Sequence, residues 1–236
     1  MTRALSILLL LSVFLVGGNL SKAALGPRDP CIHGNRVRFT DADGTRLVGA
    51  RYGHGTTAVV LAHQSEGNLC QWQPYARRLA AQGFLALPFD FRNYGESQQG
   101  SYPAAQLGGD VIAAAKEARS LGARRVFLVG ASMGGTAVVV AAANAKPPVN
   151  GVVSVSGSSS YGSLDAEAAA KWLAVPALYL AGKGDTVFAY EARTLFAATP
   201  GKTKALKLLP GSQHGTGLVG SSSRARALIE TFIRSH

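Results

Sequence analysis

The chain has 236 residues, of which 47% are hydrophobic and 16% are charged, and this composition excludes a disordered chain. Lys and Arg number 24 against 13 Asp and Glu, a formal net charge of +11, but there is no long basic run or nucleic-acid-binding motif, so no specific nucleic acid partner is expected. The charge favours a solvated basic surface, with weak electrostatic contact to an anionic envelope or membrane surface as the alternative.

The N-terminal segment, residues 1–23, has the three zones of a secretory signal peptide. Arg3 supplies the positive zone, an apolar run over residues 4–18 follows, and the small residues Ser21 and Ala23 suit cleavage after Ala23. The apolar run is shorter than the ~20 residues that span a membrane, although a retained anchor is the alternative. We therefore expect a secreted or cell-envelope (periplasmic) protein after cleavage.

A lead-in over residues 24–35 precedes one expected domain, residues 36–236. The domain begins with a predicted hairpin over 36–52, and short apolar runs then alternate with amphipathic stretches. The expected strands are 58–62, 84–89, 126–129, 152–155, 177–180 and 205–209, and the expected helices are 71–82, 104–121, 136–145, 164–173, 190–198 and 222–234. This alternation predicts an α/β fold with a mostly parallel central sheet, an N-terminal antiparallel hairpin, and helices on both faces.

The turn after the run at 126–129 reads Gly-Ala-Ser-Met-Gly over residues 130–134, with the serine at Ser132. Gly-x-Ser-x-Gly between a strand and a helix is typical of a strained turn that lifts the serine hydroxyl above the sheet. Residues 130 and 134 must then be small to let the strand and helix pack. Ser132 is therefore the candidate nucleophile, and a glycine-rich phosphate-binding turn is the alternative.

A serine hydroxyl needs a base, and the base needs a carboxylate that orients it. Asp185 follows the expected strand at 177–180, and His214 follows the strand at 205–209, where ligands gather in parallel sheets. Asp185 has a second interpretation as the cap of the following helix, and Asp165 is a rival acid at an expected helix start. The sequence favours Ser132, Asp185 and His214 as the catalytic set.

The chain order Ser, Asp, His, with each residue after a separate strand, resembles the α/β-hydrolase fold over essentially the whole mature chain. The stretch from Asp90 to Ser97 is similar to the family's Asp-x-Arg-Gly-x-Gly-x-Ser loop, with Asn93 in place of the first glycine. Asn tolerates left-handed backbone, so this departure is mild. The resemblance is to the small, cap-less branch of the family, which includes esterases and dienelactone hydrolases. A carboxylate at the position of Glu66 is similar to the dienelactone hydrolases, but those enzymes carry cysteine as the nucleophile, whereas this chain has Ser132.

His63-Gln64-Ser65 stands where the family usually has His-Gly followed by an oxyanion-hole residue. The resemblance implies that the backbone N–H of Met133, with that of Gln64 or Ser65, holds the oxyanion. Gln64 at the glycine position leaves the choice between the last two open. His63 is interpreted as a structural histidine bonded to the loop backbone, with a catalytic base as the alternative.

Many family members carry a helical cap over the serine, but here the corresponding stretch, 157–175, is mostly one expected helix. The resemblance therefore implies a minimal cap, an open cleft and a preference for short acyl groups. Tyr161 is the candidate substrate-binding residue, and an ordinary exposed loop tyrosine is the alternative.

Two cysteines in a secreted protein favour a disulfide, so we expect Cys31 and Cys70 to be bonded, with two free thiols as the alternative. No histidine–carboxylate cluster has metal-ligand spacing, so neither a metal nor another cofactor is implied. The predicted function is a secreted, cofactor-independent serine hydrolase that cleaves short-chain carboxylic esters of small molecules. A peptidase or amidase of the same fold and a non-catalytic binding protein are the alternatives, and the oligomeric state stays open.

Overall fold

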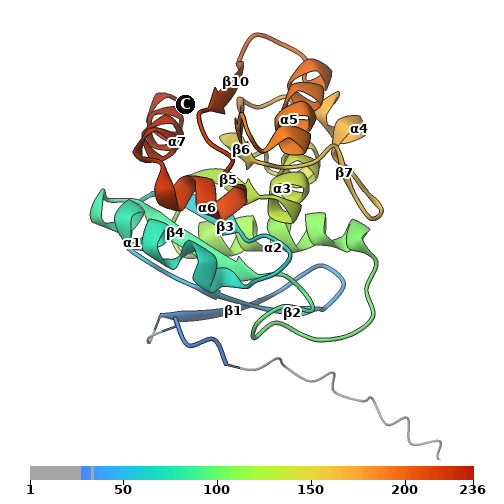
Figure 1. Ribbon diagram of the computed structural model, residues 1–236. Coiled ribbons are helices and arrows are strands. Elements are labelled where there is room, and N and C mark those ends of the chain that lie inside the picture. Colours follow the sequence, from blue (N-terminus) through green and yellow to red (C-terminus); the bar gives the residue numbers. More distant parts are fainter. Residues whose placement is uncertain (1–27, 33–34) are drawn as a thin grey trace, which may run out of the picture.

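The computed structural model describes residues 28–32 and 35–236, so the signal peptide expected over residues 1–23 lies outside the described residues. In the described part, eight strands form one sheet in the order β1-β2-β4-β3-β5-β6-β9-β10 (Figure 1). The strands are β1 Arg36–Thr40, β2 Arg46–Ala50, β3 Thr57–Ala62, β4 Leu85–Asp90, β5 Arg125–Ala131, β6 Gly151–Val155, β9 Ala177–Gly182 and β10 Lys204–Leu209.

The direction of the strands confirms the predicted sheet. β1 and β2 form the antiparallel hairpin, and β2 pairs antiparallel with β4. All remaining neighbours in the sheet, from β4 to β10, run parallel. The carboxyl ends of β3, β5, β6, β9 and β10 therefore meet at one edge of the sheet, which is where the candidate site residues follow the strands.

Helices cover both faces of the sheet, and each face has its own apolar core (Figure 1). One layer holds α1 Gln73–Ala81, α6 Gly215–Ser221 and α7 Ser223–Ser235, and the other holds α2 Leu107–Ser120, α3 Met133–Asn144 and α5 Thr186–Ala198. In β3, Val60 packs into one core and its neighbours Val59 and Leu61 into the other. All three side chains are buried, and such burial on both faces explains why this strand is apolar throughout.

The helix expected over residues 164–173 is shorter in the structure, where α4 runs only over Ala166–Ala170. A two-stranded hairpin, β7 Ser160–Tyr161 and β8 Leu164–Asp165, takes the residues before it. Gly162, with φ of +54°, makes the hairpin turn, and the Asp165 carboxylate begins α4 by accepting the N–H of Ala168 at 2.8 Å. The interpretation of Asp165 as a helix start is therefore correct.

Two further helices, α5 and α6, also differ from the prediction. α5 begins at Thr186 instead of residue 190, and its first turn exposes Val187 and Tyr190, so it lacks the apolar period of a buried helix. α6 was not expected, because its sequence, Gly-Thr-Gly-Leu-Val-Gly-Ser, has poor helix propensity. Leu218 and Val219 anchor it to the core. Short 3₁₀ helices, η1 Leu69–Trp72 and η2 Ala104–Gln106, precede α1 and α2.

The lead-in is attached to the domain by the predicted disulfide between Cys31 and Cys70. Asp29, which is also buried, donates its N–H to Glu96. Burial and the adjoining carboxyl of Asp29 raise the pKa of Asp90 to about 9, so Asp90 is protonated at neutral pH. In the described part of the chain, the helices are all too short or too polar to cross a membrane.

Candidate active site

Ser132 lies in the sharp turn between β5 and α3, with φ of +50° and ψ of −118°. A Cβ at Gly130 would lie 2.1 Å from the carbonyl oxygen of Gly134, and a Cβ at Gly134 would lie 2.4 Å from that of Ala62. Both positions therefore need glycine, as the sequence predicted, because a side chain would push the strand and the helix apart. The turn leaves Ser132 partly exposed at the carboxyl edge of the sheet.

Asp185 and His214 follow β9 and β10, and the Oδ2 atom of Asp185 lies 2.8 Å from the Nδ1 atom of His214. Asp185 precedes α5, but its side chain makes no capping hydrogen bond there, so its contact with His214 distinguishes it from a simple helix cap. The ring of Phe188 packs on His214 with 4.2 Å between the centroids. The carboxylate and this aromatic neighbour hold the imidazole in one orientation.

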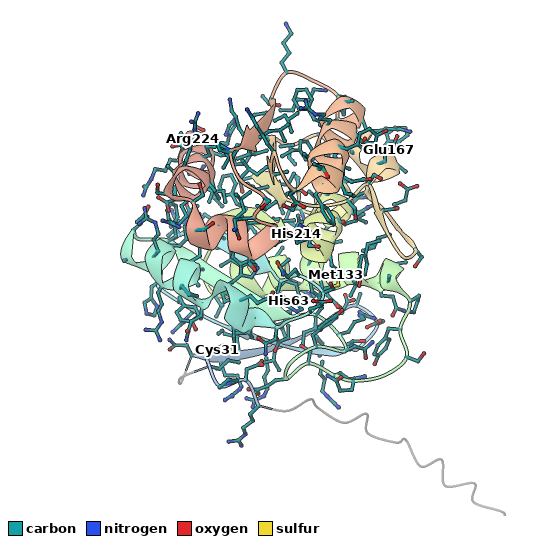
Figure 2. All side chains as sticks on the ribbon, in the orientation of Figure 1. Cys31, His63, Met133, Glu167, His214 and Arg224 are labelled. Carbon is teal, nitrogen blue, oxygen red and sulfur yellow. A yellow bond between two sulfur atoms is a disulfide. The ribbon has the colours of Figure 1, made fainter. Side chains whose placement is uncertain are left out.

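The loops that carry Ser132 and His214 are in contact. A Cβ at Gly215, the residue after His214, would lie 3.5 Å from the Cβ atom of Ala131, the residue before Ser132. The N–H of Gly215 donates to Ser156 Oγ at 3.1 Å, and Ser156 directly follows β6, the strand next to β5. In Figure 2, His214 and Met133 are labelled in the same region of the molecule. The structure thus brings the three candidate residues to one edge.

His63 supports the loop after β3. Its Nδ1 atom lies 2.8 Å from the carbonyl oxygen of Gln64, and its Nε2 atom accepts the N–H of Phe91 at 3.2 Å. Complete burial lowers the pKa of His63 to about 4, so the ring is neutral with its proton on Nδ1. His63 is a structural histidine, as interpreted from the sequence.

The contacts of Gln64 bear on the open choice of oxyanion donor. The backbone N–H of Gln64 donates to Gln71 Oε1 at 3.3 Å, so it is already engaged. The peptide between Gln64 and Ser65 is trans, and its carbonyl faces the ring of His63. The N–H of Ser65 therefore points away from that buried ring, and it donates to no group in the described residues. This geometry favours Ser65 over Gln64 as the partner of Met133.

A cleft of about 390 Å³ adjoins this site. Its lining residues come from the loop after β4, from the start of α2, from α3 and from β7: Arg92, Asn93, Tyr94, Tyr102, Pro103, Ala104, Leu107, Met133 and Tyr161. Tyr94 connects the cleft to the site, since its hydroxyl donates to Met133 Sδ at 3.5 Å and its ring packs on His63. Burial, together with the nearby hydroxyl of Tyr161, raises the pKa of Tyr94 to about 12. Tyr161 thus lines a cleft and is only partly exposed.

The loop after β4 is held by a buried arginine. Arg92 is 1% exposed, and its guanidinium forms ion pairs with Asp41, Asp43 and Asp110 at 2.6 to 2.7 Å. Asn93 has φ of +67°, the left-handed backbone expected of the residue that replaces the family's glycine. These contacts fix the wall of the cleft that carries Tyr94.

The remaining acidic candidate near the site, Glu66, has an exposed side chain. Among the described residues, no group of three or more His, Cys, Asp or Glu side chains is placed to hold a metal ion.

Sequence reasoning missed Ser156 and Phe188. Ser156 is fully buried in left-handed backbone with φ of +48°, and it contacts the residue after His214. Its position directly after an apolar strand was a usable signal, because side chains at that point face the site. Phe188 carried no such signal, since an aromatic residue three positions after Asp185 is also typical of an ordinary helix.

Comparison with known families matches residues 57–214 to the alpha/beta hydrolase fold. This match covers more than half of the chain, and the chain belongs to the alpha/beta hydrolase fold family. Family membership supports a hydrolase. A comparison with curated proteins finds no match.

Solved structures with a similar fold include hydrolases from several organisms. The esterase Pf2001 from Pyrococcus furiosus is 15% identical with a TM-score of 0.74, and the alignment covers 90% of this chain and 99% of that one. The esterase RhEst1 from Rhodococcus is 19% identical with a TM-score of 0.72, covering 85% and 99% of the two chains. The enol-lactonase from Burkholderia xenovorans is 19% identical with a TM-score of 0.69, covering 83% and 99%. At these identities the likeness establishes the fold.

Proposed function

We propose that this protein is a secreted serine hydrolase that cleaves short-chain carboxylic esters through an acyl-enzyme, with Ser132, His214 and Asp185 as its triad. The observation that carries the proposal is the 2.8 Å contact between Asp185 and His214, beside the strained turn of Ser132. The esterases and the lactonase of similar fold support ester substrates.

In the acylation half, His214 Nε2 takes the proton of Ser132 as the Oγ atom attacks the ester carbonyl. Asp185 holds the other ring nitrogen and stabilises the imidazolium that forms. The N–H groups of Ser65 and Met133 hold the carbonyl oxygen as it becomes an oxyanion. Collapse of this intermediate breaks the ester C–O bond, and His214 returns its proton to the departing alkoxide.

In the deacylation half, a water molecule replaces the alcohol. His214 takes a proton from the water, which attacks the carbonyl of the acyl-serine. The second oxyanion collapses, the bond to Ser132 Oγ breaks, and His214 protonates that oxygen. The products are one carboxylic acid and one alcohol, and the enzyme returns to its first state.

The cleft beside Met133 is proposed to take the acyl group, with Tyr161 as one wall. Each buried methylene contributes about 0.8 kcal/mol, so kcat/KM rises with chain length only while the chain stays inside the cleft. The hairpin of β7 and β8 is too small to add an apolar roof. We expect activity to level off or decline beyond about four carbons, once further methylenes stay in water.

Secretion is supported by the three zones of residues 1–23 and by the bond between Cys31 and Cys70, since disulfides persist in oxidising compartments. Mass spectrometry of the protein recovered from the expressing cells tests this part. A mature chain that begins near residue 24, outside the cytoplasm, is the expected result, and a cytoplasmic chain with an intact N-terminus would contradict it.

The catalytic part is tested with a fluorophosphonate probe, whose phosphorus bonds to an activated serine oxygen and releases fluoride. We expect labelling of Ser132 in the wild type and none in Ser132→Ala. A wild type that does not react would favour a non-catalytic binding protein.

A panel of p-nitrophenyl esters and peptide anilides then defines the substrate class. Short esters are expected to be cleaved fastest. Faster cleavage of the anilides would favour a peptidase or amidase. A steady rise in rate toward long acyl chains would show that another segment covers the cleft.

A further inference from the structure

Gln64 joins the loop after β3 to the loop that carries His214. The Oε1 atom of Gln64 accepts hydrogen bonds from the backbone N–H and from the hydroxyl of Thr216, each at 3.0 Å. The backbone of Gln64 is fixed as well, because its N–H donates to Gln71 and its carbonyl faces His63 Nδ1. A side chain held in this way has little freedom, so it connects the two loops rigidly.

The residue between His214 and Thr216 shows how closely these loops pack. Gly215 has φ of +52°, and a Cβ there would lie 2.4 Å from Gln64 Oε1. The backbone N–H of Gly215 also donates a hydrogen bond to Ser156 Oγ. The backbone directly after His214 is therefore confined between Gln64 and Ser156, and only glycine fits there.

We propose that Gln64 is a positioning residue that sets the place of His214 relative to the oxyanion donors, an inference that rests on the function proposed above. A base acts only within hydrogen-bond reach of the nucleophile, and a displacement of about 1 Å can reduce the rate roughly 100-fold. Gln64 precedes Ser65 in the chain and bonds to the residue two positions after His214. The base and the oxyanion loop thus share one support and keep a constant separation.

Two variants separate this role from simple packing. Gln64→Met keeps the length of the side chain but cannot accept the two hydrogen bonds of Thr216. Gln64→Glu keeps the acceptor and adds a negative charge close to His214. Gln213→Met is the matched control, because Gln213 is an exposed glutamine in the same loop as His214. The measurements are the rate of fluorophosphonate labelling at Ser132, kcat and KM on a short p-nitrophenyl ester, the pH profile and the Tm.

We expect Gln64→Met to label roughly 10- to 100-fold more slowly, with a matching loss in kcat and little change in KM. Gln213→Met should label at the wild-type rate. Gln64→Glu should approach the wild-type rate at alkaline pH, with the acidic limb of its profile moved to higher pH, because a nearby carboxylate favours the charged imidazolium. Asp185 bonds to His214 in all variants and the buried His63 stays neutral, so the shift reports the new carboxylate.

Wild-type labelling by folded Gln64→Met, or an unshifted acidic limb in Gln64→Glu, would overturn the inference. A lower Tm with unchanged labelling would show that Gln64 only packs. Where Gln64→Met does not fold, the labelling rate of Gln64→Glu at alkaline pH decides, because this variant keeps the acceptor for Thr216. A rate near that of the wild type supports the inference, and a loss of roughly 10-fold or more overturns it. A wild type that fails to label overturns the proposed hydrolase function. This outcome differs from a failure of the Gln64 inference, in which the wild type labels and Gln64→Met labels equally fast.

Discussion

The strained turn at Ser132 predicts that glycine at this position makes the protein more stable than alanine does. Two variants, Ser132→Ala and Ser132→Gly, lose the same hydroxyl but differ in the backbone they prefer. At φ of +50° and ψ of −118°, a residue with a Cβ is strained, and such strain amounts to about 1–3 kcal/mol. Alanine keeps this strain, whereas glycine relieves it.

The expected difference between the two variants is smaller than the strain itself. Glycine gains more freedom in the unfolded chain, which offsets about 0.5–1 kcal/mol of the relief. At the middle of these two ranges, the net gain of Ser132→Gly over Ser132→Ala is about 1.25 kcal/mol. For a chain of this length, 1 kcal/mol corresponds to about 2–4 °C, so the Tm of the glycine variant should be higher by roughly 2–5 °C.

Urea unfolding and calorimetry of both purified variants measure this difference. Neither variant should hydrolyse esters, so the two differ in stability only through the residue at position 132. Equal or lower stability of Ser132→Gly would refute the argument that the turn stores strain. A third variant, at Gly134, checks the same turn from its other end: Gly134→Ala places a Cβ 2.4 Å from the carbonyl of Ala62 and should lower the Tm.

Other predictions concern charge and covalent links. Asp185→Asn should lower kcat by roughly 10⁴-fold, since an amide cannot stabilise the imidazolium, and near-normal turnover would contradict the proposed triad. The folded protein holds a proton on Asp90 that the unfolded chain releases near pH 4, so its free energy of unfolding should fall as pH rises from about 4 to 9. In Asp29→Asn, the amide of the new side chain supplies a permanent hydrogen-bond donor, so the fall in the free energy of unfolding with rising pH should be smaller. A Tm–pH curve that matches the wild type would show that Asp29 and Asp90 do not cause this fall. Replacing Cys31 and Cys70 together by alanine should reduce the free energy of unfolding by about 4 kcal/mol for a separation of 39 residues, and a urea-measured loss under about 1 kcal/mol would contradict this.

Much of the fold and the candidate site could be predicted because the signals are local. Each candidate residue follows an apolar strand, and parallel strands bring their carboxyl ends to one edge. The sharp turn at Ser132 can be predicted because Gly130 and Gly134, the two residues that allow it, lie within two positions of Ser132. The placement of Asp185 against His214 then follows from the adjacency of β9 and β10.

What could not be predicted depends on contacts between distant segments. Gln64 and Thr216 are 152 positions apart, and nothing in either segment indicates their hydrogen bonds. The hydrogen bond from the Gln64 N–H to Gln71 depends on how the loop folds back, so the argument that favours Ser65 over Gln64 as oxyanion donor could be made only from the structure. α6 forms because its apolar residues reach the core, and this tertiary packing overrides the poor propensity of its three glycines.

The hairpin of β7 and β8 also makes the protein suitable for engineering. Its turn at Gly162 and Ser163 is exposed, and it rests on η2 through a hydrogen bond from the N–H of Ala105 to Ser163 Oγ at 2.9 Å. Exposed loop tips tolerate insertions, and this tip is separate from the sheet that carries the candidate triad. Longer segments grafted between β7 and β8 would build a roof over the cleft, so a library at this one turn can change substrate range while the sheet stays intact.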